Sequence, residues 1–334
     1  MKRVDPLVQL LGPTLLVVAT GLLGTAVSLS TQTYFVTALV NVAIVVALYL
    51  FIGNSGVLSF GHVSFVAVGA WTAGVLAVPH APKEAIMPGL AHFLRTTTVG
   101  NLPSLAIGAA VGGVFALIVG LPLMRLSGLT AGIATFAVLE ITHNVLRYWG
   151  KIGPGLNAFS SVPATTGLLQ ATVGAAVAIL AAFLYQRTRY GRLLRAARDD
   201  VAAAQAVGVS VYRQRLIAFA LSGAVAGLAG GLYIHVLPLG VEDLYLDLTF
   251  ITLAMLVIGG VNSLLGAVVG ALSVSGVNYY LANAENGGWL RHHPGTHLVV
   301  VGAFMALVLV ARPSGLTGGR ELSVPRLRSD KVQT

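Results

Sequence analysis

The stretch Tyr190–Arg215, YGRLLRAARDDVAAAQAVGVSVYRQR, is a polar, strongly basic run in the middle of a chain that is otherwise apolar. Arginines gather in it and just before it: Arg187, Arg189, Arg192, Arg195, Arg198, Arg213 and Arg215. Glycine-rich apolar segments long enough to cross a membrane lie on both sides. Lys and Arg near the ends of membrane spans are retained on the cytoplasmic side. We therefore expect this loop to face the cytoplasm.

The composition defines the class of protein. The 334 residues are 56% hydrophobic and only 9% charged, with a mean hydropathy of +0.86, whereas soluble domains carry roughly 25% charged residues. The 40 glycines fit helices that associate in lipid by close backbone approach. These features predict an all-α polytopic membrane protein. The absence of cysteine excludes disulfides and thiolate chemistry.

Segments of about 20 apolar residues predict about ten transmembrane helices, near 8–29, 35–53, 57–78, 103–123, 127–146, 167–185, 216–236, 247–261, 264–283 and 297–311. The first is too long for the apolar core of a signal peptide and is expected to stay uncleaved. This topology places both termini in the cytoplasm. Of the 20 Lys and Arg residues, only Lys83, Arg95, Arg147, Lys151 and Arg291 then fall outside. The positive-inside rule also explains the net charge of +9 without nucleic acid as a partner.

Two glycine-rich interruptions divide the apolar pattern, near 53–62 and 259–266. Each has Ile-Gly, a polar and glycine-rich turn, and then a new apolar run. In transporters, broken helices at corresponding positions of two halves often mark the substrate path. Tight turns between neighbouring helices explain the pattern equally well, and the sequence leaves both interpretations open.

The predicted domain organisation is simple. Residues 1–311 form one transmembrane domain, which includes the cytoplasmic loop 186–215. Residues 312–334 are polar and basic, and we expect a disordered cytoplasmic tail. The proline-rich segments 79–102 and 147–166 are expected on the external surface.

No motif indicates an enzyme. The chain has no GxxxxGK[ST] phosphate loop, no HExxH zinc motif and no G-x-S-x-G nucleophile elbow. His292, His293 and His297 could hold a metal, but an interfacial polar cluster is the favoured interpretation. We therefore expect no catalytic residue, cofactor or metal in this chain.

The basic loop contains a predicted short helix. Asp199 and Asp200 can cap the alanine-rich segment 201–207, which includes Ala202 and Ala203, and Gly208 then ends it. Such a helix of small residues could enter a groove on a partner protein. An ordinary basic loop that binds anionic lipid headgroups is the alternative, and the residues alone favour neither.

Few ionisable residues lie at membrane depth. Glu140 could be functional, but an interfacial carboxylate paired with Arg147 or His143 is favoured. A structural hydrogen bond to exposed carbonyls is favoured for His62 over a proton relay. The glycines at spacing four in 216–236 and in 103–123 predict helix-packing faces: Gly223, Gly227, Gly231, Gly108 and Gly112.

Several motifs resemble one known family when they are taken in order. They are Ser59-Phe60-Gly61-His62 with Phe65, Gly69 and Ala70; Leu126-Ser127-Gly128-Leu129 with Thr135 and Glu140; Tyr190-Gly191-Arg192 through Gly208; Ala218-Phe219 with Ser222; Gly259-Gly260; and Arg312-Pro313 with Gly315-Leu316. From about residue 40 to 316 the chain resembles the LivM-type permease subunits of bacterial branched-chain amino acid ABC importers.

The resemblance implies a role for the basic loop and for the two breaks. The loop would contact ATP-hydrolysing subunits through Gly191, Arg192, Arg195, Arg198, Asp199, Ala202, Ala203 and Gly208. The translocation path would involve Ser59, Gly61, His62, Thr135, Glu140, Gly259 and Gly260. The implied partners are a second homologous permease, two cytoplasmic ATPases that hold ATP and Mg²⁺, and an external solute-binding protein. The implied location is the bacterial inner membrane.

The sequence also departs from the family pattern, at Trp149–Leu156, at Val261-Asn262-Ser263 and at Ala267. Because of these departures, urea, amides or another small solute are alternative substrates to branched-chain amino acids. The alternatives from other classes are a self-sufficient ion-coupled carrier and an integral membrane enzyme. A carrier would be expected to have more buried charge than this chain carries.

Overall fold

The computed structural model describes residues 6–287, 296–312 and 314–318, and every long element in them is a helix. The predicted histidine cluster 292–297 and the tail beyond 318 lie outside the residues whose side chains are described. The helices are α1 Pro6–Thr25, α2 Leu29–Ser55, α3 His62–Ala77, α4 His80–Ile86, α5 His92–Thr96, α6 Asn101–Leu123, α7 Gly128–Tyr148, α8 Leu168–Arg187, α9 Arg189–Asp199, α10 Val201–Ala206, α11 Val211–Ile234, the 3₁₀ turn η1 Glu242–Leu244, α12 Leu246–Gly259, α13 Leu264–Gly287 and α14 Thr296–Ala311.

Each predicted span overlaps one of these helices. Six helices in the described residues are long and apolar enough to cross a membrane: α2, α6, α7, α8, α11 and α13. Two shorter apolar helices, over 9–25 and 62–77, belong to α1 and α3. The chain is therefore a multi-pass helical membrane protein.

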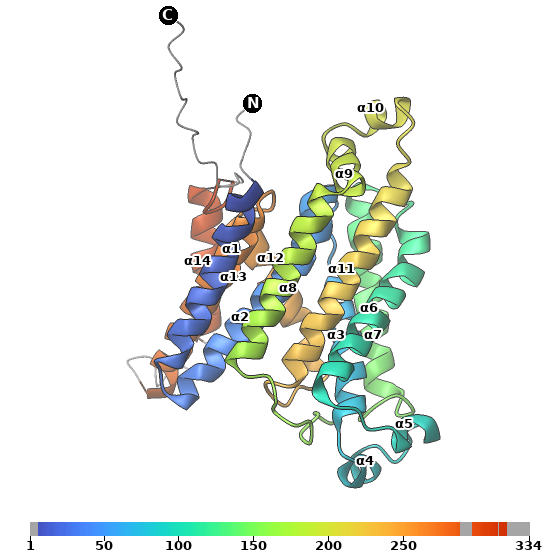
Figure 1. Cartoon of the computed structure of the whole chain (residues 1–334), viewed down its shortest axis with the longest axis vertical. Coiled ribbons are helices and arrows are strands. Elements are labelled where there is room, and N and C mark those ends of the chain that lie inside the picture. The colour runs from blue at the N-terminus through green and yellow to red at the C-terminus, as the bar shows by residue number, and fades with distance from the viewer. Residues whose placement is uncertain (1–5, 288–295, 313, 319–334) are drawn as a thin grey trace, which may run out of the picture.

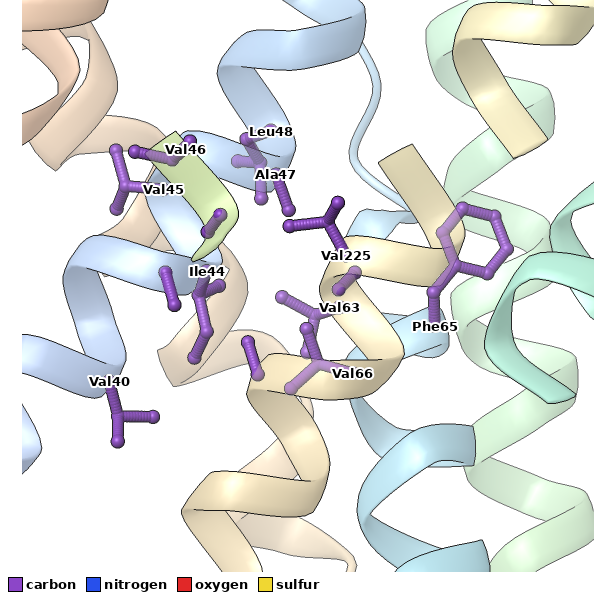
Figure 2. Packing of buried hydrophobic residues seen from close by; sticks show 14 of the residues in the cluster. Val40, Ile44, Val45, Val46, Ala47, Leu48, Val63, Phe65, Val66 and Val225 are labelled. Carbon is purple, nitrogen blue, oxygen red and sulfur yellow. The ribbon is translucent and has the colours of Figure 1, made fainter. Parts of the chain in front are cut away.

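The core of the bundle is built around α2 and α11. α2 is apolar on all sides, and nearly every residue from Leu39 to Ser55 is buried, as expected for a helix without a polar face. α11 packs against α2, α3 and α6. Figure 2 shows Val225 of α11 between Ala47 of α2 and Val63 of α3. α11 thus lies between α2 and α3, the helices before and after the first glycine-rich interruption.

Glycines allow α3, α6 and α11 to approach closely. A methyl group added to Gly69 would collide with the backbone of Gly227, and one added to Gly112 would lie 2.8 Å from the carbonyl oxygen of Gly223. A methyl group added to Gly108 would likewise lie 2.9 Å from the carbonyl oxygen of Gly69. The packing faces predicted from the glycine spacing are confirmed.

The two ends of the bundle differ in structure. α9 and α10 lie at one end, where α1 begins and α14 ends, and α4 and α5 lie at the other (Figure 1). The Arg187 guanidinium at the end of α8 donates to Gln9 Oε1 in the first turns of α1, at 2.7 Å. The bond ties the start of the chain to the basic loop.

The proline-rich segment 79–102 contains two short helices, α4 and α5. Lys83 holds them together, because its buried ammonium group donates to the carbonyl oxygens of Leu94 at 3.2 Å and Thr97 at 2.6 Å. Burial disfavours the charged form, and it lowers the pKa of Lys83.

Candidate functional site

The first half of the basic loop is the helix α9, which the sequence analysis did not predict. The Thr188 hydroxyl caps it by accepting from the Gly191 N–H at 3.2 Å. Gly191, Leu194 and Ala197 form its buried face. Gly191 leaves no room for a side chain, because an added methyl would collide with the Tyr185 carbonyl oxygen. The three-residue spacing of the small and apolar residues was the signal for this helix.

The second half of the loop is α10, where the prediction of a capped helix is confirmed. The Asp200 carboxylate accepts from the Ala203 N–H at 2.9 Å. The helix ends at Ala206, and Gly208 follows in the left-handed conformation with φ +83°. Ala202 and Ala203 are exposed.

Arg198 on α9 joins the basic loop to both glycine-rich interruptions. Its guanidinium donates to the Gly53 carbonyl oxygen at 2.6 Å and to Asn262 Oδ1 at 3.0 Å. It also lies 3.5 Å from the carboxylate of Asp199. Arg195 donates to the Gln186 carbonyl oxygen at 2.8 Å, which holds α9 against α8. Arg192, in contrast, is exposed, and its guanidinium makes no hydrogen bond or ion pair with the described residues.

The first interruption is a non-helical segment that enters the bundle. α2 ends at Ser55, Gly56 has φ +69°, and residues 57–61 precede α3. The Phe60 N–H donates to the Thr135 hydroxyl of α7 at 3.1 Å, and the tight contact of Gly61 with the Thr135 carbonyl excludes a side chain. Non-helical backbone at membrane depth needs such internal partners. The first interruption is thus a non-helical segment whose backbone has partners inside the bundle.

His62 begins α3 at the centre of a buried cluster. Its Nδ1 lies 2.7 Å from the Ser59 hydroxyl, and its Nε2 lies 2.8 Å from the hydroxyl of Ser222 on α11. The rings of Phe51 and Phe219 pack against it, each with centroids 5.3 Å away. His62 thus has a structural hydrogen-bonded position, but its partners are serine hydroxyls and not the carbonyls that the sequence analysis expected.

Ser222 was missed as a partner of His62, because the two residues are 160 positions apart. The Ser222 hydroxyl also donates to the Ala47 carbonyl oxygen at 2.7 Å. Of the predicted path residues, the structure thus brings together Ser59, Gly61, His62 and Thr135.

The second interruption is a tight turn between antiparallel neighbours. α12 ends at Gly259, Gly260 has φ +117°, and α13 begins at Leu264. Gly259 contacts the Gly266 backbone so closely that a methyl group would collide with it. The chain after α14 covers this turn, because the Leu316 N–H donates to the Ile258 carbonyl oxygen at 2.7 Å. The tight-turn alternative therefore holds for this interruption.

The two interruptions are neighbours in space. A methyl group on Gly53 would lie 2.7 Å from the Val261 carbonyl oxygen. Together with the bonds of Arg198, this contact gathers the basic loop and both glycine-rich segments at one end of the bundle.

Glu140 lies elsewhere, in a polar cluster toward the other end. It accepts hydrogen bonds from Asn144, at 2.7 Å, and from the Tyr245 hydroxyl. The pairing with Arg147 or His143 that we expected is wrong. Both bases face Glu242 instead, Arg147 at 2.8 Å and His143 at 3.4 Å. The cluster thus connects α7 to the segment before α12.

This geometry defines the class of protein. It is a multi-pass helical membrane protein in which a basic helix, α9, is hydrogen-bonded through Arg198 to both glycine-rich interruptions between its apolar helices. Comparison with known families is specific. Residues 30–309 match the family described as "Branched-chain amino acid transport system / permease component". The chain belongs to this family.

Relatives agree with this membership. The chain is 25% identical over 303 residues to the high-affinity branched-chain amino acid transport system permease protein LivM of Escherichia coli K12, covering 79% of this chain and 64% of that protein. It is 34% identical over 152 residues to a probable branched-chain amino acid transport permease protein LivH of Methanocaldococcus jannaschii, covering 44% and 46%. It is 24% identical over 318 residues to a probable branched-chain amino acid transport permease protein LivM of Methanocaldococcus jannaschii, covering 83% of this chain and 90% of that protein.

The chain thus spans about half to two thirds of the length of the first two of these relatives. No solved structure matches it.

Proposed function

We propose that the chain is a transmembrane permease subunit of an ATP-driven importer for branched-chain or related amino acids. Family membership supports the transport role. The observation that carries the mechanism is Arg198. One guanidinium on an interfacial helix is hydrogen-bonded to Gly53 in the first interruption and to Asn262 in the second.

In this proposal α9 and α10 contact cytoplasmic ATPases, which bind ATP and Mg²⁺ and close on them. The contact residues are the predicted ones: Gly191, Arg192, Arg195, Arg198, Asp199, Ala202, Ala203 and Gly208. A displacement of α9 would be transmitted through Arg198, because its bonds to both interruptions must move or break. The expected consequence is a change in the end of α2 and in the turn between α12 and α13.

The residues predicted to line the translocation path are given roles by this arrangement. The segment 56–61 is held by Thr135 and by the His62 cluster, so its movement would open or close a route beside α7. Ser59, Gly61, His62 and Thr135 would act as its hinge and support, and Gly259 and Gly260 as the second hinge. Glu140 would link α7 to α12 near the other end of the route.

The proposed topology has about ten spans over residues 1–311, with both termini and the loop 186–215 in the cytoplasm. The charges of the described residues support this orientation. Arginines crowd the end with α9 and α10, whereas the end with α4 and α5 carries Lys83, Arg95, Arg147 and Lys151. In a bacterium the membrane would be the inner membrane, and substrate would arrive on an external binding protein.

Purification of the tagged protein from native membranes in mild detergent tests this proposal. We expect mass spectrometry to find a homologous permease and nucleotide-binding subunits with it. A chain that is recovered alone, after crosslinking before lysis, would contradict the proposal and favour a self-sufficient carrier. Uptake assays with the binding protein that accompanies the complex would then identify the substrate.

A further inference from the structure

A pocket opens between α9 and the first turns of α11. Its volume is about 560 Å³. Arg189 and Leu193 of α9 line one side, Val207 and Gly208 the connecting segment, and Arg213, Gln214 and Ile217 of α11 the other side. α8 ends at Arg187 and α11 begins at Val211, so the pocket lies at the end of the bundle where these two long apolar helices end and begin.

The two arginines of this pocket have no anionic partner. Arg189 and Arg213 are exposed, and in the described part of the chain neither guanidinium makes a hydrogen bond or an ion pair. The acidic residues of the loop are engaged, since Asp199 pairs with Arg198 and Asp200 caps α10. The pocket therefore presents two positive charges that no acidic group of the described residues neutralises.

The remaining lining suits a lipid. Leu193, Val207 and Ile217 give the pocket apolar walls next to the charges, which matches a headgroup with the first part of its acyl chains.

We propose that this pocket binds an anionic phospholipid, with its phosphate between Arg189 and Arg213. The proposal rests on the cytoplasmic orientation proposed above and goes beyond the transport role. Because Gly208 lines the same pocket, bound lipid would hold the corner between α10 and α11.

Native mass spectrometry of the purified chain in detergent tests the site, with added dioleoylphosphatidylglycerol or dioleoylphosphatidylcholine. We expect the double variant Arg189→Gln, Arg213→Gln to bind phosphatidylglycerol about thirtyfold more weakly, at ~1 kcal/mol per basic side chain near an anionic surface. Binding of phosphatidylcholine should not change. Arg192→Gln is the matched control, because it removes an unpaired arginine from the same helix but outside the pocket.

The proposal is overturned if the double variant and Arg192→Gln bind phosphatidylglycerol equally, or if the unaltered protein binds both lipids equally. Displacement of the lipid by millimolar inorganic phosphate would assign the site to a free anion. Loss of co-purifying ATPase with unchanged lipid affinity would assign the pocket to the protein partner. If circular dichroism shows that the double variant is misfolded, the two single variants are compared with Arg192→Gln instead. Each single variant is expected to bind phosphatidylglycerol about fivefold more weakly than the unaltered protein.

Discussion

His62 shows how one buried polar residue can fix a break in a membrane helix. It joins Ser59 in the non-helical segment to Ser222 on α11. Removing it leaves two buried hydroxyls short of a partner and creates a cavity among aromatic rings. We therefore expect His62→Ala to destabilise the protein by about 2–5 kcal/mol, measured by thermal unfolding in detergent.

The exposed His80 is the control, and His80→Ala should leave the unfolding temperature unchanged. Ser222→Ala and the double variant complete a cycle with His62→Ala. Additive effects in that cycle would mean that the bond between His62 and Ser222 contributes nothing to stability.

Gly208 gives a second prediction at the level of one residue. Its φ of +83° is unfavourable for a β-branched side chain, but an added Cβ has nothing within 4 Å. Gly208→Val should therefore strain the backbone after α10 by about 1–3 kcal/mol without a steric collision. We expect normal membrane insertion and ATP hydrolysis that is uncoupled from uptake, measured in proteoliposomes with the co-purified partners.

Gly150→Val is matched to Gly208→Val, because its Cβ would also meet open space but its φ is not positive. It should transport normally. Normal uptake by Gly208→Val would argue that the conformation after α10 has no part in coupling.

The link between elements depends on Arg198. Replacing it with Gln removes charge-assisted bonds to Gly53 and Asn262, each worth ~1.5 kcal/mol or more. We expect Arg198→Gln to assemble with its ATPases but to import at least about tenfold less substrate per ATP hydrolysed. Arg125→Gln, an exposed arginine at the same end, serves as the control and should keep the normal ratio.

The elements differ in how far the sequence could predict them. α10 was predictable because its cap, its alanines and Gly208 are adjacent in the sequence. The glycine faces of α6 and α11 were predictable from a spacing of four. The contact of Arg198 with Gly53 was not, because 145 positions separate the two residues and no local pattern records the distance. The same limit explains why Ser222 and Glu242 were missed as partners of His62 and of the bases on α7.

At the scale of the whole molecule, orientation is the property on which the transport proposal depends. The chain contains no cysteine, so single cysteines can report which side of the membrane a position faces. Gln205 lies in α10, Ser160 lies before α8, and Ser28 joins α1 to α2; all three are exposed. The positive-inside rule predicts that Gln205 is cytoplasmic and the other two are external.

We therefore expect a membrane-impermeant maleimide to label Ser160→Cys and Ser28→Cys in intact cells, and Gln205→Cys only after the membrane is opened. Only α8 is expected to cross the membrane between Ser160 and Gln205, so labelling of both cysteines from the same side would show that α8 does not cross. Five predicted spans, α2, α3, α6, α7 and α8, separate Ser28 from Gln205, and this odd number of crossings places the two positions on opposite sides of the membrane. Labelling of both Ser28→Cys and Gln205→Cys only after the membrane is opened would therefore mean that one of these five helices does not cross.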